Sequence, residues 1–208
     1  MAQTEVKQAL GTGVVIEAVQ SLTGAESIAP DHMGRSRVSA VGYIPKSLPV
    51  DAALLRDIQV RLTQQAAMLD ARRWNEWMEL FTDDGVYWMP ASPEQTDHVS
   101  QPSIFAEDRL LMEVRAARLL HPNAWSQAAH WATQHLLGTT LVEQMQGGDL
   151  WTWTPFQMME VRRDRVRHFG GSYRHHLVRQ GSGWKIRLQR VDMFNAQASY
   201  DYVIQAWV

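Results

Sequence analysis

The sequence predicts an α+β domain in which helices come first and a curved, mostly antiparallel sheet follows. Three observations support this fold class. Apolar residues recur at helical spacing between residues 51 and 70. Residues 184–189 alternate between apolar and polar side chains, as in a strand with one buried face. Glycine-containing turns separate further strand-like stretches in the last third of the chain. A curved sheet wrapped around the long first helix would form a cone with a mouth at one end.

The chain divides into an extension and a domain. Residues 1–48 contain five glycines, no tryptophan and a single aromatic residue, Tyr43. We expect them to form an N-terminal arm that lacks regular structure on its own. Residues 49–208 hold the nine tryptophans, and so many large rings require a thick core or a sizeable interface.

The helices are predicted from capping residues and periodicity. Asp51 is an N-cap residue, and the helix after it has an apolar face made of Leu55, Ile58, Leu62, Ala66 and Leu69. A short second helix carries Trp74, Trp77, Met78 and Phe81. Residues 86–89 read as a short strand that Pro90 ends, and a polar loop over 91–103 follows. A third helix is expected over 107–120, with Leu110, Leu111, Val114, Ala117 and Leu120 facing inward.

Strands are expected over 135–145, 151–161, 165–178 and 184–194, with a short last one over 202–208. Pro155 indicates a sheet edge or a bulge, because proline cannot donate to a strand ladder. Gly170 and Gly171 indicate a bend. The alternation ends after Gln189, which either a bulge near Arg190 or burial of both strand faces would explain.

Composition excludes several kinds of site. The chain has no cysteine, so it cannot hold a disulfide, a thiolate zinc site, a catalytic cysteine or a cysteine-bound iron–sulfur cluster. No apolar run reaches the length of a membrane span, and the first residues do not read as a signal peptide. We therefore expect a cytoplasmic protein.

Charge is distributed unevenly along the chain. Residues 156–208 carry nine basic and four acidic side chains, although the net charge is −2. The densest basic cluster spans residues 162–167. Nucleic-acid binding is not expected, because the domain as a whole is not basic. Docking onto an acidic protein partner and plain solvation both remain open for this cluster.

The histidines and carboxylates give no clear catalytic set. His130 and His135 lie five residues apart, and His175 and His176 are adjacent on a strand, so neither pair is spaced to share a metal ion. Structural, hydrogen-bonded histidines are the favoured interpretation. The acidic residues of Glu107-Asp108-Arg109 fit a first helical turn, where the helix dipole favours negative charge.

Four stretches together resemble the small (beta) subunit of aromatic-ring-hydroxylating Rieske dioxygenases. These are residues 71–90, Glu107-Asp108-Arg109, residues 134–138 and residues 183–191. The resemblance covers residues 50–208. Two departures stand out: the arm before residue 49 is longer than expected, and Gln134 occupies the position where the family usually has an arginine.

The resemblance implies a cystatin-like cone, the shape of ketosteroid isomerase and scytalone dehydratase. It also implies a hexamer of three large (alpha) and three small subunits, in which the small subunits form a trimeric base. The Rieske 2Fe-2S cluster and the mononuclear Fe(II) would belong to the large subunit, which would receive electrons from a ferredoxin or reductase. No catalytic, cofactor or metal residue is then expected in this chain.

Two alternatives and one interface hypothesis accompany this interpretation. A stand-alone dehydratase or isomerase of the same shape would place an acid–base set in a closed, ligand-sized pocket, and a non-catalytic ligand-binding cone is the third possibility. The acid–base set would comprise His135, His130, Asp108 and Tyr87.

The excess of Trp and Arg near strand ends predicts subunit contacts. The residues expected there are Trp88, Trp131, Arg165, Arg167 and Arg187.

Overall fold

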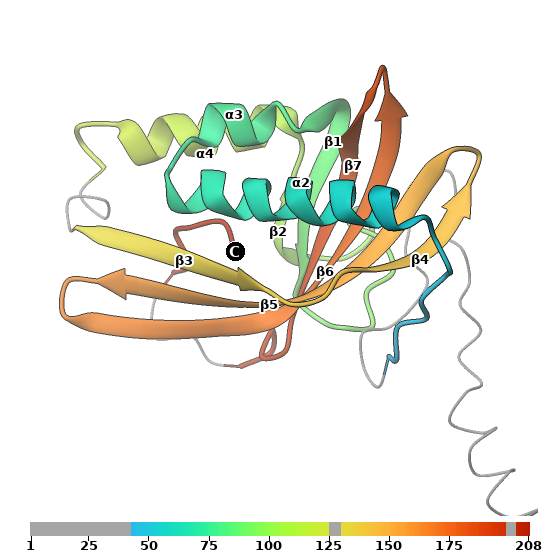
Figure 1. Cartoon of the computed structure of the whole chain (residues 1–208). Helices are drawn as coiled ribbons and strands as arrows, with labels where there is room; N and C mark the ends of the chain where they lie inside the picture. Colours follow the sequence, from blue (N-terminus) through green and yellow to red (C-terminus); the bar gives the residue numbers. More distant parts are fainter. Residues whose placement is uncertain (1–42, 125–129, 199–202) are drawn as a thin grey trace, which may run out of the picture.

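The computed structural model describes residues 43–124, 130–198 and 203–208. The helices of these described residues lie on one side of a strongly curved sheet (Figure 1). They are α2 (Ala52–Asp70), α3 (Trp74–Met78) and α4 (Arg109–Leu120). This arrangement confirms the predicted α+β class. The predicted arm falls mostly outside the described residues, and its last part, 43–48, carries no helix or strand.

The sheet has seven strands among the described residues, in the order β2-β1-β7-β6-β5-β3, with β4 also paired to β5. β1 and β7 run parallel, and the other pairs are antiparallel. The long β5 pairs with β4 along its first half and with β3 along its second. The strands are β1 (Phe81–Pro90), β2 (Ser103–Glu107), β3 (Trp131–Leu137), β4 (Leu141–Gln146), β5 (Asp149–Arg162), β6 (Arg165–Gln180) and β7 (Gly183–Met193).

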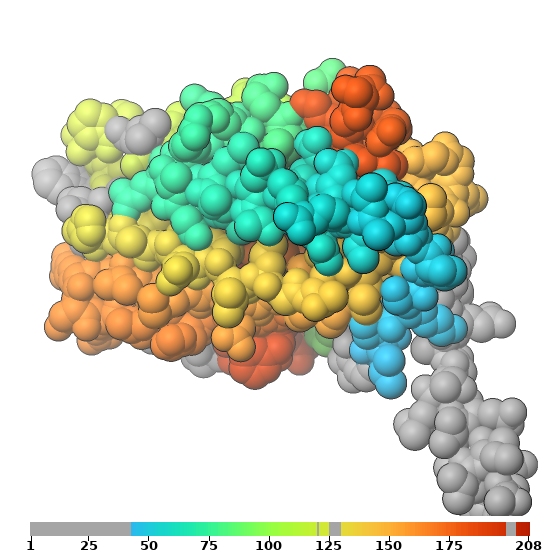
Figure 2. All heavy atoms as spheres, in the orientation of Figure 1, coloured from blue at the N-terminus to red at the C-terminus, as the bar shows by residue number. Residues whose placement is uncertain are grey.

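Helix α2 follows its prediction closely. The side chain of Asp51 accepts hydrogen bonds from the backbone N–H groups of Ala53 and Leu54, which satisfies two donors of the first helical turn. Four of the five predicted inward residues are buried, and Leu55 is half-buried. In the space-filling view α2 crosses the molecule above β3 and β4, and residues 43–50 continue beside β4 (Figure 2).

Helix α4 presents a different face to the core from the one predicted. Leu110, Leu111 and Val114 are 65%, 48% and 57% exposed, whereas Met112 and Ala116 are buried. The helix has apolar residues on every side, so periodicity could not select the inward face. A tertiary contact selects it, because Arg115 bonds to the partly buried Glu107 at 2.6 Å and stacks over Phe105.

The strands differ from their predictions in detail. The expected strand over 135–145 is two strands, β3 and β4, and Pro155 lies opposite the gap between them, where its carbonyl accepts from the N–H of Gly138 at 2.8 Å. The irregularity in β7 lies at Arg187, which has no partner on β6, and not at Arg190. Burial of both faces after Leu188 is confirmed. No strand forms over residues 203–208.

The end of the sequence fills the interior of the cone. Trp207 and Val208 are 2% and 0% exposed, and they lie between the helices and the sheet (Figure 1). The indole of Trp207 lies 4.9 Å from the ring of Trp77 and 6.1 Å from that of Trp74, measured between centroids. The tryptophan-rich core expected from composition is therefore closed by residues far apart in the chain.

Candidate functional site

The cone interior, where an acid–base enzyme of this shape would hold its substrate, is occupied by a cluster of large apolar side chains. Between α2 and the sheet lies a cavity of about 10 Å³, lined in part by Gln65, Tyr173, His175 and Gln189. A volume of this order holds about one water molecule, whereas small-molecule sites measure roughly 300 to 1,000 Å³. This cavity between α2 and the sheet is therefore too small for the ligand-sized pocket expected of a stand-alone enzyme.

The predicted acid–base residues lie at separate places with separate roles. The Tyr87 hydroxyl is fully buried and donates to the carbonyl of Val208 at 3.1 Å. The Asp108 side chain caps α4 by accepting from the N–H of Leu111. His130 is exposed in the loop before β3. The structure therefore does not bring these groups together around a common space.

His135 has a structural partner that the sequence did not indicate. Its Nδ1 lies 2.6 Å from a carboxylate oxygen of Asp70, and its backbone N–H donates to the other oxygen at 2.9 Å. Thr133 also donates to Asp70, at 3.0 Å. Burial raises the pKa of Asp70, but the bonds from His135 and Thr133 outweigh it and leave the pKa below its usual value. These hydrogen bonds connect the end of α2 to β3, so His135 has a structural role.

The adjacent histidines of β6 point to opposite faces of the sheet. Both ring nitrogens of buried His175 lack a hydrogen-bond partner, and burial lowers its pKa to about 3. His176 bonds through Nε2 to Asp149 at 2.8 Å and stacks on Trp151 at 4.3 Å. Within the described ranges no three His, Asp or Glu side chains gather as metal ligands would. These residues therefore fit neither a Rieske cluster nor a mononuclear iron.

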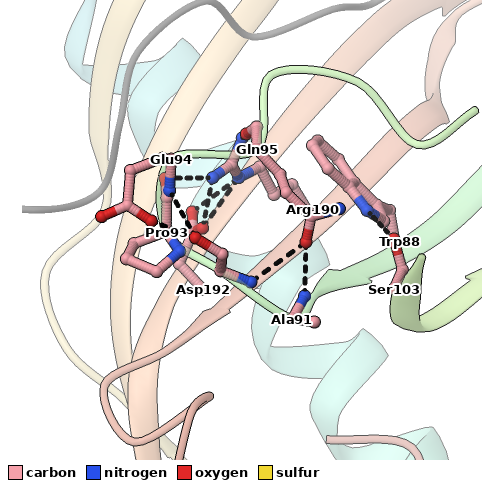
Figure 3. A network of polar contacts seen from close by, with 9 residues as sticks. Trp88, Ala91, Pro93, Glu94, Gln95, Ser103, Arg190 and Asp192 are labelled. Atoms are coloured by element: carbon pink, nitrogen blue, oxygen red, sulfur yellow. Dashed lines mark hydrogen bonds and ion pairs between the residues drawn. The ribbon is translucent and has the colours of Figure 1, made fainter. Parts of the chain in front are cut away.

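The two tryptophans expected at an interface are buried inside the chain itself. Trp88 is 0% exposed, donates to the hydroxyl of Ser103 at 2.9 Å, and lies under the guanidinium of Arg190 (Figure 3). Trp131 is 4% exposed and stacks on Trp74. Neither ring is free to anchor a partner in this fold. Trp131 belongs to the hydrophobic core, whereas Trp88 is covered by Arg190 and lies beside His98.

Arg190 forms a buried network that no local signal predicted. Its guanidinium pairs with Asp192 at 2.7 Å and donates to the backbone carbonyls of Pro93 and Gln95 (Figure 3). The side-chain oxygen of Gln95 in turn accepts from the N–H of Ala91 at 2.6 Å. This network fastens the 91–102 loop onto the sheet, so a loop that reads as polar and open in sequence is partly buried.

The predicted interface arginines are placed at two ends of the sheet. Arg165 is exposed beside the β5–β6 turn, and Arg167 is half-buried, facing Glu160 across the strands. Close to them, the guanidinium groups of Arg72 and Arg162 flank the Trp131 ring at 4.2 and 5.4 Å. The turn therefore forms the edge of a positively charged end of the molecule.

Arg187 lies elsewhere and is already paired within the chain. Its guanidinium lies 3.3 Å from Asp84 and 3.9 Å from Asp149, and its side chain is 39% exposed. Asp149 is also the partner of His176. The bulge in β7 puts Arg187 in this network, and only a part of the side chain remains available to another subunit.

Comparison with known proteins identifies the family. Residues 64–198 match the ring hydroxylating beta subunit family. The chain belongs to that family. It is 24% identical over 144 residues to the small subunit of 2-halobenzoate 1,2-dioxygenase from Burkholderia cepacia, covering 67% of this chain and 87% of the relative.

Solved structures show the same fold. The beta subunit of benzoate 1,2-dioxygenase from Burkholderia mallei matches with a TM-score of 0.59 and 22% identity, over 76% of this chain and 99% of that one. Naphthalene 1,2-dioxygenase with indole bound matches with a TM-score of 0.65 and 16% identity, over 77% of this chain and 88% of that one. As a member of the matched family, this chain is a beta subunit of an aromatic-ring-hydroxylating dioxygenase. In its described part, no helix has the length and apolar character needed to cross a bilayer.

Proposed function

We propose that this beta subunit is a non-catalytic assembly subunit in a hexamer of three large and three small subunits. The large subunit would carry the Rieske cluster and the mononuclear iron, and would insert dioxygen into an aromatic ring with electrons from a ferredoxin or reductase. The small subunits would form a trimeric base beneath the large ones and hold the assembly together.

The observation that carries this proposal is the filled interior of the cone. Trp74, Trp77 and Trp207 pack together where a cone enzyme would bind substrate, and the cavity of about 10 Å³ between α2 and the sheet is too small for an aromatic molecule. His135 and His176 are bonded to Asp70 and Asp149, and buried His175 faces the other side of the sheet from His176. A beta subunit built in this way would provide contact surface for the complex and stabilise it. The catalytic chemistry would take place in the large subunit.

The positively charged end supports a partner with an acidic surface. Exposed Arg165 and half-buried Arg167 lie beside the cation-flanked Trp131 ring. Arginine suits such contacts because its planar donors match carboxylates, and charge complementarity chiefly speeds association and selects partners. We propose that this end, with Arg165 and Arg167 at its edge, contacts the large subunit, and that Arg187 has a smaller part in assembly.

Co-expression with the large subunit of the same oxygenase tests the proposal. A complex with equal numbers of the two chains, recovered by native mass spectrometry and showing the absorption of a Rieske cluster, is the expected result. The beta subunit purified alone should be colourless and have no ring-hydroxylating activity. A colourless homo-oligomer that fails to bind any large subunit would overturn the proposal, and His135→Ala would then test the acid–base alternative.

A further inference from the structure

Three buried polar side chains meet at the small cavity between α2 and the sheet. Gln65 comes from α2, His175 from β6 and Gln189 from β7, and all three line this cavity of about 10 Å³. Their exposed fractions are 4%, 1% and 0%, so bulk water does not reach them. We call these three residues the buried polar cluster.

The members of the buried polar cluster are direct neighbours. The Nε2 of Gln65 donates a hydrogen bond to the Oε1 of Gln189 at 2.5 Å. His175 and Gln189 are opposite each other in the antiparallel pair of β6 and β7, so their side chains leave the same face of the sheet about 5 Å apart. The rest of the cavity wall is formed by Leu62, Ala66, Leu69, Leu137 and Tyr173.

The cluster contains more hydrogen-bonding atoms than its own contacts satisfy. The Oε1 of Gln65, the Nε2 of Gln189 and both ring nitrogens of His175 have no hydrogen-bond partner among the described residues. Buried polar atoms are nearly always hydrogen-bonded, because an unpaired one loses its hydration without compensation. Exchanging the oxygen and nitrogen of both amides would reverse the bond between the glutamines and still leave one donor and one acceptor unused.

The unused atoms call for a neutral molecule that both donates and accepts hydrogen bonds. Burial lowers the pKa of His175 to about 3, so the ring is neutral near pH 7 and offers one donor and one acceptor. A cation is disfavoured, because one of the two amides presents an N–H group in either orientation. An organic molecule is excluded by the volume. Water fits, since it needs about 10–15 Å³ and two to four polar partners.

We propose that one water molecule is bound in this cavity and bridges α2 to β6 and β7. It donates to the Oε1 of Gln65, accepts from the Nε2 of Gln189 and bonds to one ring nitrogen of His175. This bridge adds to the direct bond between the glutamines and holds α2 in place over the sheet (Figure 1). The inference concerns contacts within one chain, so it stands independently of the proposed assembly function.

A crystal structure of the full-length chain, in which ordered waters are visible, tests the proposal directly. The expected result is one isolated density peak within about 2.7–3.2 Å of Gln65, Gln189 and a ring nitrogen of His175. An empty cavity would overturn the proposal, and so would a rearrangement that pairs His175 with a protein atom. A peak surrounded by oxygen atoms at metal-ligand distances would also overturn it, because it would mean a cation.

His175→Phe tests the bridge in solution, because it keeps a planar ring and removes both ring nitrogens. With the water bound, the variant leaves the water one partner short, and the equilibrium constant for unfolding should rise about tenfold. Without the water, removing two unpaired nitrogens should stabilise the fold and lower this constant. A lower or unchanged constant would therefore contradict the proposal. Urea denaturation followed by circular dichroism measures the constant.

A second background separates loss of the bridge from crowding by the larger phenylalanine ring. Gln65→Met and Gln189→Met together remove the amides that hold the water at nearly constant volume, so His175→Phe should cost little there. The matched control is Gln64→Met, an exposed neighbour on α2, where His175→Phe should keep its tenfold effect. An equal cost in all backgrounds would show crowding and overturn the proposal. If the double methionine variant does not fold, the crystal structure of the unaltered chain decides.

Discussion

The indole N–H of Trp207 donates a hydrogen bond to a carboxylate oxygen of Glu107 across 3.0 Å inside the cone. The other carboxylate oxygen of Glu107 accepts a hydrogen bond from the guanidinium of Arg115, a residue of α4. Burial raises the pKa of Glu107, and although Arg115 and Trp207 oppose that shift, the pKa stays above its usual value. This hydrogen bond connects Trp207 to the last residue of β2.

We expect Trp207→Ala to destabilise the fold strongly. The change empties a site lined by Trp74 and Trp77 and removes a hydrogen bond from buried Glu107, so a loss of about 3–5 kcal/mol in the free energy of unfolding is expected. Urea denaturation followed by circular dichroism measures it. The control is Trp153→Ala on the outer face, where the ring is only half-buried. A loss at Trp153 equal to that at Trp207 would contradict the plugged interior.

His175 should make the protein sensitive to mild acid. Its pKa is about 3 in the fold and about 6.5 when unfolded, so below pH 6.5 the unfolded state binds a proton that the folded state does not. The contribution of neutral His175 to the free energy of unfolding is therefore complete above pH 6.5, and it is lost as the pH falls toward 3. At pH 5 the expected loss is about 2 kcal/mol.

The measurement is the free energy of unfolding at several values between pH 7 and pH 5. His175→Gln should flatten the slope over this interval, whatever it does to stability at pH 7. The control is His121→Gln, an exposed position, which should retain the slope of the unaltered protein. A slope unchanged by His175→Gln would show that other groups cause the acid sensitivity.

Two neighbouring glycines should differ sharply in their tolerance of alanine. A Cβ at Gly171 would lie 2.0 Å from the carbonyl oxygen of Asp192, because β6 and β7 approach closely there. At Gly170 the nearest atom, the carbonyl oxygen of Phe156, is 3.6 Å away. Gly171→Ala is expected to lower the midpoint of thermal unfolding by several degrees or to prevent folding, and Gly170→Ala to change it little. Equal midpoints would contradict this strand contact.

Charge reversal at the β5–β6 turn should weaken assembly. Arg165→Glu is expected to lower the affinity for the large subunit by about tenfold, with a loss that grows at low salt because rim charges act through long-range attraction. Lys46→Glu, an exposed site distant in sequence, is the control for net charge. Arg187→Glu should have a smaller effect on affinity. Normal assembly of Arg165→Glu would exclude this end as the contact.

The sequence determined the local elements that depend on neighbours along the chain. The cap at Asp51, the apolar face of α2 and the alternation that begins β7 each follow from residues a few positions apart, and the structure confirms all three. The absence of cysteine excludes a cysteine-bound cluster on composition alone, because no thiolate ligand exists anywhere in the chain. The order of the motifs between residues 71 and 191 indicated the family, which the comparison confirms.

Tertiary structure alone decided what depends on distant partners. The inward face of α4 is set by the pairing of Arg115 with Glu107, and the burial of Trp88 by the Arg190 network. His135 acquired its role from Asp70, 65 residues away. The filling of the cone by Trp207 likewise joins segments far apart in sequence. Periodicity shows only which side chains are apolar. Contacts between segments that are distant in sequence determine which of these side chains become buried and which residues they pack against.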